Sequence, residues 1–185
     1  MASLPASDFA SAVAAVRALQ LRPEVELAEA PAPRRMAPEA LALTAEVVLD
    51  DNELGNGRLV VLHNPAGEDA WEGATRLVVY IDALVEPELA SDPLLPQVGW
   101  TWLEESLDNA DASHWALGGT ITRVQSESFG AMDDRGSEGR VQMRASWTAQ
   151  LTDLPRHVEA WADVLSTACG LEPLPVGVAA LHRIR

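Results

Sequence analysis

The sequence predicts an α+β fold, in which helices pack against an antiparallel sheet. Three observations predict it. Apolar residues recur at helical spacing near both ends of the chain, runs of alternating apolar and polar residues lie between them, and short turns rich in Gly, Asn and Pro join those runs. Strands joined by short turns favour an antiparallel sheet over alternating strand and helix units. We therefore expect one domain of 185 residues with the order α-β-β-β-α-β-β-α and a five-stranded sheet.

The first helix is expected over residues 8–21, because Phe9 and Val13 begin a series of apolar residues at helical spacing and Pro23 follows it. Residues 22–40 contain four prolines. Proline lacks a backbone N–H and biases the residue before it away from the helical conformation. We therefore expect residues 22–40 to be an extended connector.

Three strands are expected next, over residues 41–49, 58–63 and 75–85, where apolar residues alternate with polar ones or run together. Residues 51–57 end in Asn-Gly, which favours the positive φ angles of a tight hairpin turn. Residues 64–67, Asn-Pro-Ala-Gly, are also typical of a turn. The three strands are therefore expected to form an antiparallel meander.

A proline-rich loop is expected over residues 86–96, followed by a helix over 97–109. Two further strands are expected over residues 114–128 and 140–149. The glycine pair Gly118-Gly119 indicates a bulge or bend inside the first of these two strands. The second strand alternates apolar and polar residues throughout, which is typical of a strand with one buried face.

The last helix is expected to begin after Asp153, which can cap it, and to end at Gly170. Residues 171–185 are expected to form a tail. The same order of elements occurs in the secretion-chaperone-like fold, whose members are often small acidic dimers that bind other polypeptides. This likeness is one of topology, and topology does not fix function.

The negative charge is concentrated in one part of the chain. The sequence has 28 acidic residues, 13 arginines and no lysine, for a formal net charge of −15. Residues 24–111 hold 19 acids and four arginines, so this segment alone carries −15. Such a charge opposes binding to nucleic acids and to anionic membranes, and Arg34-Arg35 is too small a basic patch to reverse it. We therefore expect neither as a partner.

The sequence also indicates in which cellular compartment the protein is expected. The N-terminus lacks a basic region before its apolar stretch, and no apolar run approaches the ~18 residues that span a bilayer. A single cysteine, Cys169, excludes an internal disulfide. We expect a cytoplasmic protein.

Motifs for catalysis or metal binding are absent from the sequence. The four histidines lack HxxxH or HExxH spacing, and there is no glycine-rich phosphate loop and no GxSxG elbow. Cys169 falls at the end of the last expected helix, where the helix dipole disfavours a thiolate, and is expected to be a buried apolar residue. We predict no catalytic residue, no metal site and no cofactor. Whether the protein is an enzyme stays open, with the balance against it.

Five residues are candidates for binding a ligand or a partner. Trp100 and Trp102 diverge by about 200° on a helix, so one can pack inward while the other contacts a partner or covers the sheet. Arg140 and Arg144 project from the polar face of a strand, where they can hold an anion or pair with the chain's own acids. His63 ends a strand close to acidic residues and is the remaining candidate.

Five segments carry a resemblance to a known family. They are LRPEVEL at 21–27, GRLVVLH at 57–63, DPLLPQVGW at 92–100, ESFG at 127–130 and RASWT at 144–148. They resemble an actinobacterial family of uncharacterised proteins, domain of unknown function 3000, over about residues 8–180. The resemblance implies a bacterial cytosolic protein and supplies no catalytic residue.

Two functional hypotheses follow. The first is a non-enzymatic protein-interaction or chaperone-like module, which we expect to be a homodimer, with a partner or the arginine face of a second copy meeting the acidic segment 24–111. The second is a small-ligand-binding protein or an enzyme, with a pocket between sheet and helices formed by His63, Arg144 and an acid.

Overall fold

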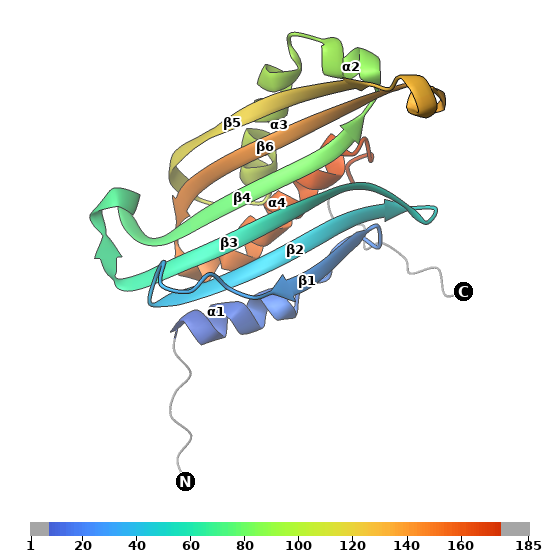
Figure 1. The fold of residues 1–185 in the computed structure, drawn as a ribbon. Helices are drawn as coiled ribbons and strands as arrows, with labels where there is room; N and C mark the ends of the chain where they lie inside the picture. The colour runs from blue at the N-terminus through green and yellow to red at the C-terminus, as the bar shows by residue number, and fades with distance from the viewer. Residues whose placement is uncertain (1–7, 175–185) are drawn as a thin grey trace.

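The computed structural model describes residues 8–174, in which six strands form one antiparallel sheet with the order β1-β2-β3-β4-β6-β5. The strands are β1 (Val25–Ala30), β2 (Glu39–Leu49), β3 (Asn52–Glu68), β4 (Gly73–Val85), β5 (His114–Glu127) and β6 (Ser137–Ala149). The helices are α1 (Asp8–Arg17), α2 (Pro87–Ser91), α3 (Leu95–Asn109) and α4 (Leu154–Ala168), with 3-10 turns η1 (Asp69–Trp71), η2 (Gly130–Arg135) and η3 (Leu151–Asp153). The α+β class and the antiparallel sheet are confirmed (Figure 1).

The expected number of strands was wrong, because the proline-rich connector contains β1. This strand pairs with β2 along its length, from Val25 opposite Val47 to Ala30 opposite Ala42. Pro23 and Pro31 lie just outside it, so neither removes a hydrogen bond from the ladder. An edge strand has only one paired side, which is why a segment this short between prolines can join the sheet.

The position of the first hairpin turn was also wrong. The chain turns at Asp50 and Asp51, whose φ angles are 50° and 62°, as a two-residue hairpin of the primed type requires. Asn56-Gly57 lies inside β3, which is much longer than the expected strand over 58–63. Gly57 serves packing there, because a Cβ atom on it would lie 3.0 Å from the indole of Trp161.

Two smaller differences concern helices. The loop over 86–96 contains the short helix α2, and α3 begins at Leu95 rather than at residue 97. The helix expected over 8–21 ends at Arg17. Residues 175–185 of the expected tail lie outside the described residues.

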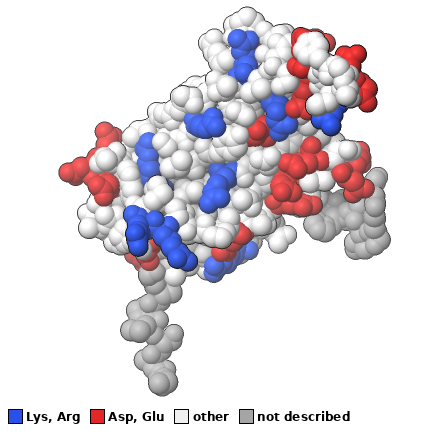
Figure 2. Space-filling view, in the orientation of Figure 1, with Lys and Arg blue, Asp and Glu red and all other residues white. Residues whose placement is uncertain are grey.

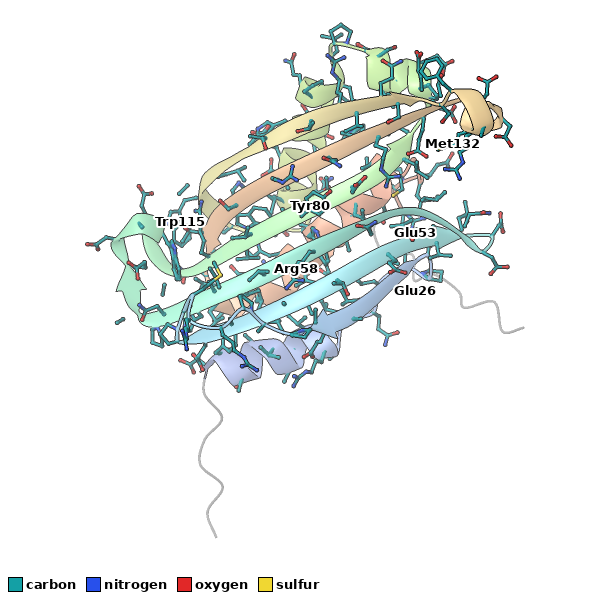
Figure 3. The ribbon with its side chains drawn as sticks, viewed as in Figure 1. Glu26, Glu53, Arg58, Tyr80, Trp115 and Met132 are labelled. Carbon is teal, nitrogen blue, oxygen red and sulfur yellow. The ribbon has the colours of Figure 1, made fainter. Side chains whose placement is uncertain are left out.

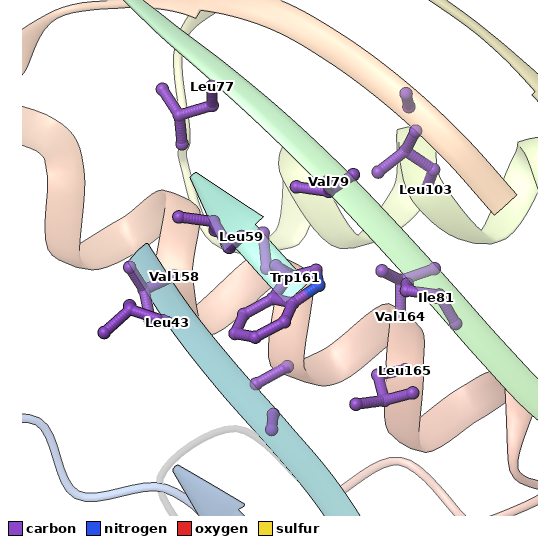
Figure 4. Close-up of a cluster of buried hydrophobic side chains, with 14 of the residues drawn as sticks. Leu43, Leu59, Leu77, Val79, Ile81, Leu103, Val158, Trp161, Val164 and Leu165 are labelled. Atoms are coloured by element: carbon purple, nitrogen blue, oxygen red, sulfur yellow. The ribbon is translucent and has the colours of Figure 1, made fainter. Parts of the chain in front are cut away.

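The core lies between the sheet and its helices. Trp161 of α4 is fully buried and packs among side chains of β2, β3 and β4 (Figure 4). The residue that follows α4 packs tightly on β3, since a Cβ atom on Gly55 would lie 2.6 Å from Cys169 Sγ. Alternate residues of every central strand point to this core, as the 2-residue period of a strand requires.

The other face of the sheet is open. Within residues 8–174 all four helices lie on the core side, and no helix crosses the opposite face (Figure 1). The polar residues of each alternating strand therefore point away from the helices. In the same part of the chain, no helix is both long enough and apolar enough to traverse a lipid bilayer.

Candidate binding surface on the open face of the sheet

The open face carries a cavity of about 630 Å³. All of its lining residues come from four adjacent strands, β3, β4, β6 and β5, so it has a floor of sheet and no covering element. The lining side chains that matter for binding are Arg58, Val60, Val78, Tyr80 and Arg144. We call this group of residues the arginine surface.

The strand register places three of these residues in one row across the sheet. Arg58 lies opposite Tyr80, and Tyr80 lies opposite Arg144. Residues directly opposite one another in antiparallel strands have Cβ atoms about 5 Å apart. The guanidinium carbon of Arg144 lies 5.0 Å from the centre of the Tyr80 ring, a cation–π contact that orients the arginine. Figure 3 shows Arg58 and Tyr80 on neighbouring strands of this face.

The next row supplies an apolar floor. Val60 lies opposite Val78, and Val78 lies opposite Ser146. Val78 is 42% exposed, an unusual position for a β-branched residue in the middle of a sheet. Beyond Ser146 lies Gly118, where a Cβ atom would meet no atom within 4 Å. An apolar strip therefore runs beside the row of arginines.

The row on the other side of the arginines contains Asp82, whose charge is balanced by partners within the molecule. Asp82 accepts hydrogen bonds from Arg140 Nε at 2.7 Å, from Gln142 Nε2 at 3.1 Å and from the Tyr80 hydroxyl at 3.1 Å. Burial, followed by the charge of Asp82, raises the pKa of Tyr80, so its hydroxyl remains a donor. Arg140 also lies 3.6 Å from Glu138. Arg140 thus pairs with the chain's own acids.

Arg76, at the opposite end of the open face, also has hydrogen-bond partners within the molecule. It donates to the hydroxyls of Thr148 and Ser146 at 3.0 and 2.7 Å, and to a main-chain carbonyl of β5 at 3.0 Å. Within the part of the chain that the structure describes, Arg58 donates one hydrogen bond, to the carbonyl of Pro31 at 3.4 Å. Among the described residues, neither Arg58 nor Arg144 forms a salt bridge. These two guanidinium groups are therefore available to an external anion.

His63 does not belong to this surface. Its ring points to the helix side, stacks on Phe9 at 5.6 Å between centroids, and places Nδ1 2.9 Å from the Thr75 hydroxyl. Arg144 points to the opposite face of the sheet. The expected pocket between sheet and helices, shared by His63 and Arg144, was therefore wrong, because the sheet itself separates the two side chains.

The two tryptophans of α3 also lie apart from the arginines. Trp100 and Trp102 are half-buried and pack against the core from the helix side. Their helix meets β5 through Gly99, where a Cβ atom would lie 3.1 Å from Ile121. Arg140 and Arg144 thus share the open face of β6, but only Arg144 lines the cavity, and His63, Trp100 and Trp102 lie on the helix side.

The sequence does indicate the positions of Arg58 and Tyr80, which were not predicted as site residues. Arg58 and Tyr80 stand at solvent-facing positions of two expected strands, and so does the exposed Val78. What joins them is the pairing of β3 with β4 and of β4 with β6. The second pairing skips β5 in the chain, and no local pattern indicates it.

The acidic residues surround this surface instead of covering it. Figure 2 shows acids gathered mainly at the two ends of the strands, over the β3–β4 hairpin and the β2–β3 turn, with arginines across the middle. The hairpin contributes Glu68, Asp69 and Glu72, and the turn contributes Asp50 and Asp51. The arginine surface is thus a local basic region on an acidic protein.

The described residues offer neither a metal-binding cluster nor a reactive thiol. Within residues 8–174, no three His, Cys, Asp or Glu side chains are grouped so that they could hold a metal ion. Burial raises the pKa of the Cys169 thiol to about 12, which keeps it protonated. Cys169 is therefore a packing residue against β3.

Comparison with known proteins identifies a family and no ligand. A family model described as "Protein of unknown function (DUF3000)" matches residues 5–179. No curated protein and no solved structure matches the chain. The likeness to secretion chaperones, which was drawn from element order, gains no support from these comparisons.

Proposed function

Because the chain belongs to DUF3000, a family described as proteins of unknown function, we propose a function from its open face: a non-enzymatic module that binds an acidic segment of another polypeptide. The observation that carries the proposal is the row Arg58–Tyr80–Arg144, whose two guanidinium groups form no salt bridge with a carboxylate of residues 8–174. Guanidinium groups bind carboxylates through paired hydrogen bonds. A location in the cytoplasm is part of this proposal.

The shape of the surface favours a polypeptide over a small molecule. Pockets for small ligands bury most of the ligand's surface. The cavity here is lined from one side only, by strands of a single sheet. A segment of chain can lie across such a surface, with acidic side chains on Arg58 and Arg144 and apolar ones on Val60 and Val78.

The chemistry of the lining favours binding over catalysis. General acid–base catalysis needs a group such as His, Asp, Glu or Cys within reach of the substrate. No residue of these four types lines the cavity in the described part of the chain. Tyr80 is present, but its pKa is raised, so at neutral pH its hydroxyl stays protonated and cannot serve as a base.

A defined peptide tests the proposal. The probe is a fluorescein-labelled peptide of about ten residues with alternating Glu and Leu, long enough to cross the surface at ~3.3 Å per residue. Arg58→Gln and Arg144→Gln should each weaken its binding about 10- to 100-fold, since a hydrogen bond to a charged group is worth ~1.5–3 kcal/mol. Fluorescence anisotropy measures the affinity.

Two controls make the result specific. Arg135→Gln changes an arginine of η2 that does not line the cavity, and it should leave the affinity unchanged. A Lys/Leu peptide of the same length should not bind. Equal binding of the acidic and basic peptides, or unchanged binding in both arginine variants of the surface, would contradict the proposal.

Self-association is the second part of the proposal. The chain itself is an acidic polypeptide, and its acids at the strand ends could meet the arginine surface of a second copy. Light scattering at micromolar concentration should then show a homodimer that Arg58→Gln and Arg144→Gln weaken. If light scattering shows only a monomer, self-association is rejected, and the proposed partner is then a different polypeptide.

The alternative is a small anionic ligand with an apolar body. It is favoured by the size of the cavity, about 630 Å³, which lies within the range of small-molecule sites. A thermal-shift screen of metabolites decides between the two. A small anion whose stabilisation is lost in Arg144→Gln, together with no binding of the acidic peptide, would favour the alternative.

A further inference from the structure

A third arginine, Arg140, lies on the same face of the sheet as the arginine surface but does not line its cavity. It stands on β6 opposite Leu84, four residues before Arg144, and alternate residues of a strand share one face. Its side chain is 26% exposed and reaches one row along the sheet to Asp82 of β4. A further guanidinium is therefore present beside the surface, and a carboxylate of the chain itself holds it.

The carboxylate of Asp82 is bound by three donors. One of its oxygens, Oδ1, accepts from Arg140 Nε at 2.7 Å. The other, Oδ2, accepts from the Tyr80 hydroxyl and from Gln142 Nε2, each at 3.1 Å. Hydrogen bonds between ionised groups are stronger than those between neutral groups. The open face therefore already binds one carboxylate, which comes from within the molecule.

Glu138 is the weaker of the two acidic partners of Arg140. Its carboxylate lies 3.6 Å from Arg140 Nη1, and its side chain is 57% exposed, whereas that of Asp82 is 16% exposed. Ion pairs in contact with water contribute little, because solvent and salt screen them. Asp82 is therefore the residue that decides whether Arg140 can bind another carboxylate.

A segment bound at Arg144 can also reach Arg140. Four residues of a strand span about 13 Å, and an extended peptide of about ten residues spans ~33 Å. Gln142, which lies between the two arginines on the same face of β6, is uncharged and donates to Asp82. Without the carboxylate of Asp82, a peptide held by Arg144 would therefore meet a second available guanidinium on the same strand.

We infer that Asp82 is an internal competitor, which withholds Arg140 from the acidic partner and limits binding to Arg58 and Arg144. The inference rests on the proposed function, and adds to it the residue that sets the strength and the extent of binding. Asp82 has the opposite effect on folding, because its contacts with Arg140 and Gln142 join β4 to β6. The same carboxylate thus stabilises the fold and weakens the binding of the partner.

Asp82→Asn tests the inference with the same Glu/Leu peptide, because asparagine keeps the size and one acceptor oxygen and removes the charge. Anisotropy should show binding about three- to fivefold tighter than in the original protein, the range expected of one partly exposed charge pair. Urea unfolding should show a lower midpoint for the same variant. A residue with a purely structural role would lower the stability and the affinity together, and that result would overturn the inference.

A double-variant cycle identifies Arg140 as the group that is released. Arg140→Gln alone should weaken peptide binding, because it leaves the charge of Asp82 without its main partner beside the surface. Asp82→Asn combined with Arg140→Gln should return the affinity to within about twofold of the original, since the cycle isolates the pair. Tight binding that persists in the double variant would mean that Arg140 is not the released group, and would overturn the inference.

Glu138→Gln is the matched control, since it makes the same change in charge beside the same arginine. It should alter the affinity less than about twofold, because the exposed pair that it removes is weak. Equal tightening by Glu138→Gln and Asp82→Asn would mean that the net charge of the protein sets the affinity, which also overturns the inference.

The location of the peptide can be followed at Tyr80, the single tyrosine of the chain. Protein labelled with 3-fluorotyrosine gives one ¹⁹F resonance, which the peptide should shift both in the original protein and in Asp82→Asn. Tighter binding by Asp82→Asn without a shift would place the peptide elsewhere and overturn the inference.

The failure of the inference and the failure of the proposed function give different results. Binding that depends on Arg58 and Arg144 but is unchanged or weaker in Asp82→Asn overturns the inference and keeps the function. Binding by Asp82→Asn alone, lost again when Arg140 is changed, overturns the function of the original protein and keeps Asp82 as the residue that blocks Arg140. Absence of binding by both proteins overturns both.

Discussion

Gly118 and Gly119 are adjacent in β5 and have different roles. The register of β5 against β6 shifts between Trp115 and Gly118, and Ala116 there has a φ of 50°. A Cβ atom on Gly119 would lie 2.3 Å from the carbonyl oxygen of Arg144, which is main chain and cannot move aside. Gly118 faces open space. Gly119 is therefore needed for the sheet, and Gly118 for access to the arginine surface.

Gly119→Ala should lower the free energy of unfolding by about 1–3 kcal/mol, the usual cost of overpacking. Gly118→Ala is the matched control and should stay within about 0.5 kcal/mol of the original protein. Urea unfolding followed by tryptophan fluorescence measures both. Equal stability of the two variants would contradict the role given to Gly119.

His157 links stability to pH. It is fully buried, and its Nδ1 accepts a hydrogen bond of 3.0 Å from the indole of Trp147. Burial, with a further contribution from His114, lowers the pKa of His157 to about 4. Below pH 6.5 the unfolded chain takes up a proton that the folded protein refuses, so stability falls as the pH drops towards 4.

The original protein should therefore lose about 2 kcal/mol more stability between pH 7 and pH 5 than His157→Gln does. Urea unfolding of both proteins at the two pH values gives the difference, in which the contributions of other titrating groups cancel. The same loss in both proteins would show that His157 does not set this dependence.

At the scale of elements, α4 and β3 depend on each other. Gly57 leaves room for Trp161, and a Cβ atom there would also lie 2.9 Å from the carbonyl oxygen of Tyr80. Removing a large core side chain costs several kcal/mol. The two residues are thus expected to be coupled in stability.

Gly57→Ala should destabilise the protein by about 1–3 kcal/mol. Trp161→Phe should also destabilise it, through lost packing. The double variant should be less destabilised than the sum of the two, because the smaller ring relieves part of the clash. Chemical unfolding of the four proteins completes the cycle. Additive effects would mean that the clash with Tyr80 alone limits this position.

The elements that the sequence predicted well are those with a clear hydrophobic period. The alternation of Val141, Met143 and Ala145 with polar residues indicated which face of β6 is buried, and the structure confirms it. β1 was missed because its prolines were taken to exclude a whole segment, while only the six residues between them had to pair. The position of the turn was misjudged because Gly57 makes room for Trp161 and the main chain of Tyr80 instead of forming a turn, a tertiary effect that no local pattern reveals.

The candidate site was predicted only in part, for a related reason. Arg144 was identified from the polar face of its strand, but its neighbours Arg58 and Tyr80 come from strands distant in the chain. His63 was misplaced because the run Leu59–Leu62 is apolar throughout, so it does not show which face of β3 is buried and therefore which face His63 takes. Register and strand order are set by the packing of the whole sheet, so they are the information that a single sequence lacks.

At the scale of the whole molecule, a local basic surface lies on a protein whose net charge is −15. The concentration of acids in residues 24–111, seen in the sequence, becomes in space a group of acids at the ends of the strands (Figure 2). Charge far from zero keeps a protein soluble. In the proposed function, the acidic partner binds at Arg58 and Arg144, which form no salt bridge with any described residue.

Binding of the Glu/Leu peptide should therefore weaken several-fold between about 0.05 M and 0.5 M salt, since the Debye length shortens from above 10 Å to below 8 Å. Anisotropy titrations at both salt concentrations measure the change. An affinity independent of salt would mean that the charge distribution serves solubility only.

The strand order has a consequence for how the protein is made. β5 precedes β6 in the chain, yet β6 lies between β4 and β5 in the sheet. On the ribosome, β5 emerges without the neighbour it will pair with, and β4 has a bare edge until residues 137–149 follow. The core is covered later still, because α4 is the last helix. Long-range pairing of this kind is slow to form. The apolar face of β2, β3 and β4 therefore cannot be covered by α4 until all six strands of the sheet have been made.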